Sequence, residues 1–297
     1  MANLKELTDK IASLCNTQKM TRTMKLVAAS KMRRATVAQA NASEYAKALR
    51  QMIANVAATS DVSHPLLEQR DAAGAAQFLM IASDRGLCGG FNNNLFRYAW
   101  KWTQNHDPVF REMEFSVCGR RAQLFLRSRV TDVTHYEGAT ERPTYERAAE
   151  IADQLMDAFT SRRVDSVYLV FNRFKSALVQ LPTIERLLPI AQAPAHASTS
   201  DGDSTADTST GVGGASLFEP AEAELLDLLL PDAVRFSVFN ALVENAAGEH
   251  AARMAAMDAA TNNASDLIDQ CTLQRNRERQ AAITKELIEI VTGAESL

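Results

Sequence analysis

The segment RQAAITKELIEIVTGA, residues 279–294, closes the stretch of sequence that decides the fold. This stretch begins at Pro231 and contains no further proline, so nothing in it forces an α-helix to break. At a rise of about 1.5 Å per residue, a helix from Asp232 to Thr292 is about 90 Å long. A rod of this length exceeds the diameter of the domain that such a chain would form. Either it projects into a partner, or the segment is not a single helix.

The other end of the chain offers a second long helix as that partner. The first proline is Pro65 and the first glycine is Gly74, so neither residue type interrupts a helix from Asn3 to Thr59. Asn3 with Glu6 three residues later is typical of a helix N-cap followed by a capping-box acid. The sequence thus predicts two long helices, one from each end of the chain.

Heptad repeats indicate that these two helices pair with each other. In the N-terminal segment the a and d positions hold Leu4, Leu7, Ile11, Leu14, Ala28, Met32, Ala35, Ala42, Ala46, Leu49, Ile53 and Val56, and the pattern is broken by Gln18, Thr21, Lys25 and Gln39. In the C-terminal segment they hold Phe236, Phe239, Val243, Ala246, Met257, Ala260, Ala264, Leu267, Cys271, Ala281 and Ile288. Repeats of this kind favour a left-handed two-stranded supercoil. The many alanines predict a slender pair, because each buries little area.

The middle of the chain has the pattern of a small α/β layer. Short apolar runs alternate there with amphipathic segments, which is typical of strands connected by helices in mostly parallel pairing. The last apolar run contains Pro182, which places that strand at the edge of the sheet. The expected strands are 77–82, 114–118, 130–136, 166–171 and 177–187, and the expected helices are 92–105, 120–127 and 143–159.

A polar, proline- and serine-containing segment separates this layer from the C-terminal rod. Its small and polar side chains would bury too little apolar surface to offset the entropy lost on ordering the chain, so we expect a flexible surface loop. Pro220 with two acids behind it fits a helix start, and Pro231 is expected to end or kink that short helix. The predicted organisation is a coiled-coil helix over 1–60, an α/β domain over 75–191, a flexible insertion over 192–217 and a second coiled-coil helix over 218–297.

Composition and charge limit the function classes. The chain has 297 residues and a net charge of −4, and no apolar run approaches the length that spans a membrane. The four cysteines have no paired spacing, so we predict reduced thiols and no metal or cofactor. The six basic residues between Lys19 and Arg34 are not accompanied by an acid. This run fits phosphates, anionic lipid or an acidic protein loop, and the alternative is an ordinary solvated helix face.

Three stretches of the chain resemble one known family. They are IASLCNTQKMTRTMKLVAASKMR at 11–33, SDRGLCGGFN at 83–92, and EHAARMAAMDAAT at 249–261 together with the segment 279–294. In this order they are similar to the gamma subunit of F-type ATP synthases, the central rotor shaft of the enzyme. The resemblance extends across nearly the whole chain.

The resemblance implies a fold, a function and a set of partners. The fold is α/β: a long antiparallel two-helix coiled coil formed by the N- and C-terminal helices, with a small Rossmann-like α/β domain at its base. The implied function couples proton-driven rotation of the c-ring to conformational cycling of the catalytic sites on the alpha and beta subunits, without catalysis on this chain. The implied partners are the alpha, beta and epsilon subunits and the c-ring, with no nucleic acid. The implied location is the cytoplasmic side of a bacterial inner membrane, as a peripheral protein.

The resemblance also implies contact residues. Arg279, Gln280 and Thr284 match residues that contact a loop of the beta subunit, and Met24 matches a position near an acidic beta loop. Glu219 matches an acid that faces the c-ring. The alternatives are plain packing for Met24 and solvated helix surface for the polar residues. This chain has Arg275 and Glu278 where many relatives have tyrosine and alanine.

Two other classes of function compete with this one. An enzyme would use residues 86–90 as a phosphate loop, but the segment matches neither the dinucleotide motif nor a P-loop. No base accompanies Cys88, for which we predict a packed thiol. A coiled-coil scaffold or nucleic-acid-binding protein would use the basic run, and its binding to DNA would depend strongly on salt.

Overall fold

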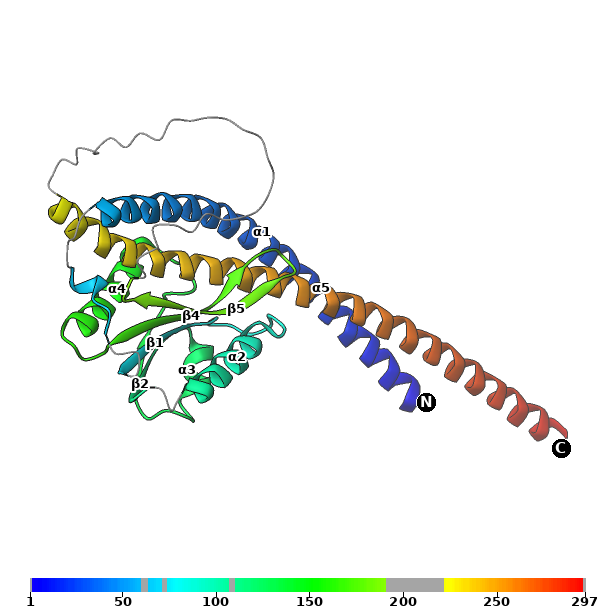
Figure 1. Ribbon diagram of the computed structural model, residues 1–297. Helices are drawn as coiled ribbons and strands as arrows, with labels where there is room; N and C mark the ends of the chain where they lie inside the picture. The colour runs from blue at the N-terminus through cyan, green and yellow to red at the C-terminus, as the bar shows by residue number, and fades with distance from the viewer. Residues whose placement is uncertain (1, 60–63, 71–73, 107–109, 191–221, 296–297) are drawn as a thin grey trace, which may run out of the picture.

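Two long helices dominate the computed structural model, which describes residues 2–59, 64–70, 74–106, 110–190 and 222–295. Helix α1 (Ala2–Thr59) and helix α5 (Glu222–Glu295) run antiparallel and side by side (Figure 1). The 74 residues of α5 correspond to a length of about 110 Å. The prediction of two paired terminal helices is confirmed.

Pro231 was predicted to end or kink a short helix, and the first of these two alternatives is wrong. Helix α5 continues through Pro231, although proline cannot donate the backbone hydrogen bond of a helix interior. One side of the helix is buried across this point, where Leu226, Leu230 and Val234 are at most 1% exposed. These side chains belong to a large hydrophobic core, and their burial offsets the lost hydrogen bond.

Between the helices the chain forms a five-stranded sheet in the order β3-β2-β1-β4-β5. All neighbouring strands pair in parallel except β5, which lies antiparallel to β4 at one edge, as Pro182 predicts. The strands are β1 (Ala75–Ile81), β2 (Glu112–Cys118), β3 (Val133–Tyr136), β4 (Ser166–Phe174) and β5 (Gln180–Leu188). The shorter helices are η1 (Pro65–Leu67), α2 (Phe91–His106), α3 (Arg120–Leu126) and α4 (Tyr145–Thr160).

The two faces of the sheet belong to two different cores. Successive residues of a strand point to opposite faces, so Phe78 packs with residues of α2 and α3 while Leu79 packs with residues of α4. The second core also contains Ile53 of α1 and Leu242 of α5. The base of the helix pair is therefore part of the same hydrophobic core as the sheet.

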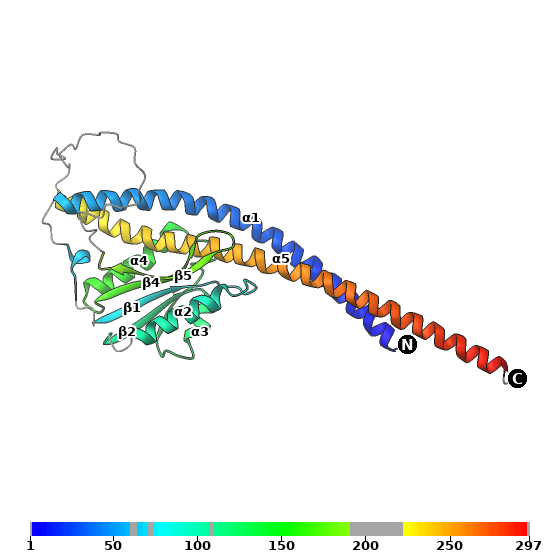
Figure 2. The ribbon, with the colours of Figure 1, turned by 45° about the vertical axis from the view of Figure 1, so that its right-hand side comes forward.

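Away from the sheet the two helices rely on the predicted seam. Buried seam residues there include Leu7 and Ala28 on α1 and Ala264 and Cys271 on α5. Three predicted seam positions are wrong: Leu267 and Ile288 are 45% and 59% exposed, and Ala281 is exposed too. Helix α5 extends beyond the first residues of α1 (Figure 2), which leaves Ala281 and Ile288 without an opposite helix.

Within the described ranges, the structure contains no helix that is both long enough and apolar enough to cross a lipid bilayer.

Candidate functional site

The site lies where the helix pair meets the carboxyl ends of strands β1 and β4. The chain leaves β1 toward β2 on one side, and β4 occupies its other side, so the order of the strands reverses there. Open α/β sheets bind ligands in the crevice at such a point. Here Ala252, Ala255 and Ala256 of α5 line that crevice together with Gly89 and Gly90, leaving a cavity of about 260 Å³. The crevice thus receives a helix.

Two glycines lie at this close approach. Gly89 has φ +58°, and a Cβ atom added to it would lie 3.7 Å from the Cβ of Ala256. On the helix itself, a Cβ atom at Gly248 would lie 3.0 Å from Cε2 of Phe91. The absent side chain of Gly248 lets α5 approach Phe91, the first residue of α2, whereas at Gly89 the positive φ is what favours glycine. A Cβ atom at Gly86 or Gly90 would instead meet Arg121 or Asn94, so these two glycines do not face α5.

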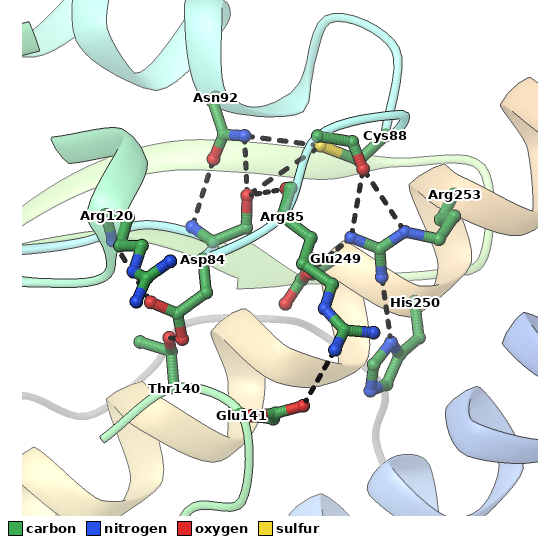
Figure 3. A network of polar contacts seen from close by, with 12 residues as sticks. Asp84, Arg85, Cys88, Asn92, Arg120, Thr140, Glu141, Glu249, His250 and Arg253 are labelled. Carbon is green, nitrogen blue, oxygen red and sulfur yellow. Dashed lines mark hydrogen bonds and ion pairs between the residues drawn. The ribbon is translucent and has the colours of Figure 1, made fainter. Parts of the chain in front are cut away.

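The loop from Ser83 to Gly90 is held in shape by buried hydrogen bonds (Figure 3). The Ser83 amide donates to Asn92 Oδ1 at 3.1 Å, and Asn92 Nδ2 donates to Ser83 Oγ at 2.6 Å. Asn92 Nδ2 also lies 3.2 Å from Cys88 Sγ. Cys88 is buried, and this burial raises the pKa of its thiol. Cys88 is a packed thiol, as predicted.

Asp84 ties the same loop to two neighbouring elements (Figure 3). Its Oδ1 accepts a hydrogen bond from the amide of Arg120, the first residue of α3, at 3.1 Å. Its Oδ2 accepts from Thr140 Oγ1 at 2.6 Å. The loop that meets α5 is therefore fixed to the rest of the domain.

Arg253 provides the polar connection between α5 and this loop. Its guanidinium donates to the carbonyl of Gly86 at 3.2 Å and 3.4 Å and pairs with Glu249 at 2.5 Å. The side chains of Arg253 and Glu249 are only 13% and 8% exposed. Burial raises the pKa of Glu249, and the charge of Arg253 opposes that rise. A buried, paired charge thus links the helix to the domain.

His250 completes this cluster as a neutral side chain. Burial, with the nearby charges of Arg253 and Lys31, lowers the pKa of His250 to about 4. Its neutral ring can accept at Nδ1 from the Arg253 guanidinium, 3.4 Å away. A second cavity of about 260 Å³ opens beside it, and Met24 and Leu87 are among its lining residues. Met24 is therefore half-buried at the junction of helix pair and domain.

The structure places the other predicted contact residues elsewhere. Arg279, Gln280 and Thr284 are exposed near the far end of α5, where Thr284 Oγ1 donates to the Gln280 carbonyl at 2.9 Å. Met24 lies beside Lys25, which pairs with Asp258, so Arg279 is about 30 Å farther along the helix. These are two separate regions. Glu219 and the segment 192–217 lie outside the described residues.

The sequence interpretation did not identify the junction residues individually. A Glu and an Arg spaced four apart, as in Glu249 and Arg253, form an ion pair on one helix face, which is the available signal. Nothing in that spacing shows that the face is buried against Gly86. Asp84 and His250 gave no separate signal.

These features define a class of protein. A long antiparallel helix pair is embedded in a Rossmann-like domain, and one helix fills the place where such a domain would bind a ligand. This arrangement is typical of a protein that acts as a shaft, in which the α/β domain is the base that holds one of the two long helices.

Comparisons with known proteins identify the family. The family model described as ATP synthase matches residues 3–297. The chain is 40% identical to the ATP synthase gamma chain of Geotalea uraniireducens over 100% of this chain and 99% of the relative. It is 41% identical to that of Pelotomaculum thermopropionicum over 100% of both chains. The chain belongs to the ATP synthase gamma-chain family.

Solved structures agree in fold. A chain of the Euglena gracilis mitochondrial ATP synthase matches with a TM-score of 0.65 at 19% identity, over 99% of this chain and 94% of that one. A central-stalk chain from Tetrahymena thermophila matches with a TM-score of 0.57 at 24% identity, over 81% and 99%. As a gamma chain, this protein is a noncatalytic subunit that forms the central rotor shaft of an ATP synthase.

Proposed function

We propose that this shaft transmits torque between a ring of c subunits at the membrane and a ring of alpha and beta subunits that carries the catalytic sites. The α/β domain faces the c-ring and the epsilon subunit, and the projecting helices enter the alpha–beta ring. In this arrangement the chain is a peripheral protein on the cytoplasmic side of a bacterial inner membrane. The segments 1–60 and 218–297 form the shaft, 75–191 the base, and 192–217 an insertion.

The observation that carries this proposal is the apolar surface at the projecting end of α5. Its large side chains there are 50–67% exposed, namely Ile283, Leu287, Ile288, Ile290 and Val291. A continuous apolar surface of this kind is typical of a site that contacts another protein. Apolar contacts have little directional preference. An orientation of the shaft that was favoured by about 1.4 kcal/mol would slow its rotation out of that orientation tenfold. Such a surface suits a bearing that must turn.

The shape of the shaft explains how torque reaches the catalytic sites. Chemically identical sites in a three-fold ring adopt different states only if something without three-fold symmetry contacts them. A two-helix rod has no such symmetry, so each orientation favours a different set of contacts. This is coupling through differential binding, and it requires no chemistry on the shaft.

Separate regions supply the polar contacts of this proposal. Arg279, Gln280 and Thr284 are exposed on the projecting helix and can grip a beta-subunit loop. Met24 lies at the junction, beside a cavity that both basic and acidic residues line. It also lies within the basic run of α1, where Lys19, Arg22 and Lys31 are exposed. An acidic beta loop fits the charge of this run. Glu219 is proposed to face the c-ring.

Reconstitution tests the function. The chain is mixed with purified alpha and beta subunits, and ATP hydrolysis and single-molecule rotation of a bead on the α/β domain are recorded. We expect a stable complex in which hydrolysis drives rotation of the bead. Failure of the chain to join the complex, or hydrolysis without rotation, would contradict the proposal.

Met24→Lys tests the junction. The new positive charge is expected to strengthen attraction to the acidic beta loop and lower proton pumping per ATP hydrolysed, with assembly retained. The measurement is ATP-driven proton uptake against ATP hydrolysis in inverted membrane vesicles. Met24→Leu, which keeps the side chain apolar, is the matched control. An unchanged ratio in Met24→Lys would remove this residue from the contact surface.

A further inference from the structure

Apolar packing along the seam between α1 and α5 specifies the register of the two helices only weakly. Many of its residues are alanines, among them Ala28, Ala42 and Ala264, which are 2%, 4% and 5% exposed. An alanine buries little area and presents the same shape at every position. Above the common core, these alanines therefore specify the register less sharply than larger interlocking side chains would.

Two polar contacts cross this seam at one level, and we name their four residues, Thr21, Lys25, Asp258 and Thr261, the neck clasp. Lys25 Nζ lies 2.5 Å from Asp258 Oδ1, and Thr261 Oγ1 lies 2.8 Å from Thr21 Oγ1. The Thr21 hydroxyl donates to the carbonyl of Gln18 at 3.1 Å, so its oxygen can accept from Thr261. Thr21 and Lys25 are two of the residues that break the heptad pattern.

The environment of Thr21 makes its hydrogen bond specific. Thr21 is 8% exposed and is the one buried polar side chain among the α1 residues whose burial the structure describes. Each hydroxyl also has an acceptor in its own helix, Gln18 for Thr21 and the Met257 carbonyl at 2.7 Å for Thr261. The contact between the two hydroxyls is therefore an additional one that the observed register supplies. A polar residue at a seam position is a known way to fix the register of a coiled coil.

A heptad slip in either direction would break both contacts. Counted along α5, it would place Lys25 opposite Ser265 or Ala251. Thr21 would then lie opposite Ile268 or Met254. Of these three registers, only the observed one brings both polar pairs together.

The neck clasp lies directly above the junction with the α/β domain. Arg253 contacts Gly86, and Ala256 lines the cavity beside Gly89. Asp258 and Thr261 follow within the next two turns of α5, after which the helix pair projects away from the sheet (Figure 2). Below this level a common core fixes both helices on the sheet, and above it they depend on each other.

We infer that the neck clasp fixes the helix register at the exit from the domain, so that α1 and α5 turn as one body. The inference rests on the proposed transmission of torque. Lys25 and Asp258 are 39% and 47% exposed, so their ion pair adds little to the stability of the fold. Its role is positioning: slip between the helices here would absorb rotation before it reached the catalytic ring.

A charge-swap experiment tests this in the complete ATP synthase in inverted membrane vesicles. Lys25→Asp and Asp258→Lys each place like charges together, and the double variant restores an opposite pair. We expect each single variant to lower the ratio of proton pumping to ATP hydrolysis about twofold or more, and the double variant to recover the parent ratio. Asp269→Lys, an exposed acid three turns along α5, is the control and should keep the parent ratio.

A second variant separates the clasp from charge effects. Thr21→Val with Thr261→Val keeps the volume of both side chains and removes the hydroxyl pair, and it should also lower the ratio. The inference is overturned if both single charge variants keep the parent ratio of proton pumping to ATP hydrolysis, or if the double charge variant is as impaired as the single ones. If the charge variants fail to assemble, a parent ratio in the valine variant overturns it. Failure of the proposed function would instead appear as absent ATP-driven pumping in the parent complex.

Discussion

The two ends of α5 differ sharply although they belong to one continuous helix. Near the sheet, Leu242 and Ala247 are completely buried in contacts with the domain and α1. At the projecting end, Leu287 and Ile290 are 58% and 67% exposed. A free helix with this much exposed apolar surface gains little from its own folding, so its sequence serves contacts outside the chain.

The comparison indicates how stability and function are distributed along the shaft. The base gains its stability from burial, because α5 lies there between the sheet, α4 and α1. The projecting end contributes little to that stability and is available for partners. Substitutions should therefore separate the two regions: changes in the base affect folding, and changes at the far end affect assembly.

The largest effect is expected from the same substitution at two leucines of α5. Leu242→Ala should lower the free energy of unfolding by about 2–5 kcal/mol, because it opens a cavity in the core. Leu287→Ala, at an exposed position, should change it by less than about 0.5 kcal/mol. Urea denaturation of the isolated chain measures both. Equal losses in the two variants would show that the far end is stabilised within the chain.

A second pair of variants compares a buried and an exposed ion pair on the same helix. Arg253→Ala leaves Glu249 buried without its partner and breaks the contact with Gly86, which should cost about 3 kcal/mol. Lys285 and Glu289 are 78% and 65% exposed, so Lys285→Ala should cost about 0–0.5 kcal/mol. Denaturation curves at neutral pH test both values. A small loss in Arg253→Ala would mean that the α5–loop connection depends on apolar packing alone.

The smallest of the three effects concerns pH and His250. Its pKa is lowered in the fold to about 4 from 6.5, so the folded state binds this proton less readily than the unfolded state. The contribution of His250 to the free energy of unfolding is thus fully present above pH 6.5, and it is lost as the pH falls toward 4. His250→Gln should flatten this decline by about 2 kcal/mol, after discounting for solvent screening.

The control for this prediction is a substitution on the same helix that changes no titratable group. Met254→Leu should keep the parent slope between pH 6.5 and 4. If His250→Gln retains the full decline, other titratable groups determine the acid sensitivity.

Much of the fold could be predicted because helix and strand periods are local properties of a sequence. The heptads before Thr59 and the apolar run at Leu79 needed no information from elsewhere in the chain. The effect of Pro231 could not be predicted in this way, because burial of Leu230 and its neighbours in the sheet core outweighs a local helix breaker.

The junction and the neck depended on information that single segments lack. Heptads do not specify how far two antiparallel helices are offset, so Ala281 and Ile288 were assigned to a seam that ends before them. For the same reason Thr21 and Lys25 were treated as interruptions, although their partners on α5 make them the polar contacts of the seam. The three stretches that carry the family resemblance did contain Asp84 and Arg253.

The filling of the sheet crevice by α5 has a consequence for ligands. A nucleotide entering at the carboxyl ends of β1 and β4 would need the space taken by Ala252 and Ala256, and it would have to displace the helix to obtain it. The cavity that remains, about 260 Å³, is below the usual size of a ligand site, so a bound nucleotide and the helix in its observed position exclude each other. In this Rossmann-like domain, the crevice at the reversal of the strand order is thus occupied from within by a segment of the same polypeptide.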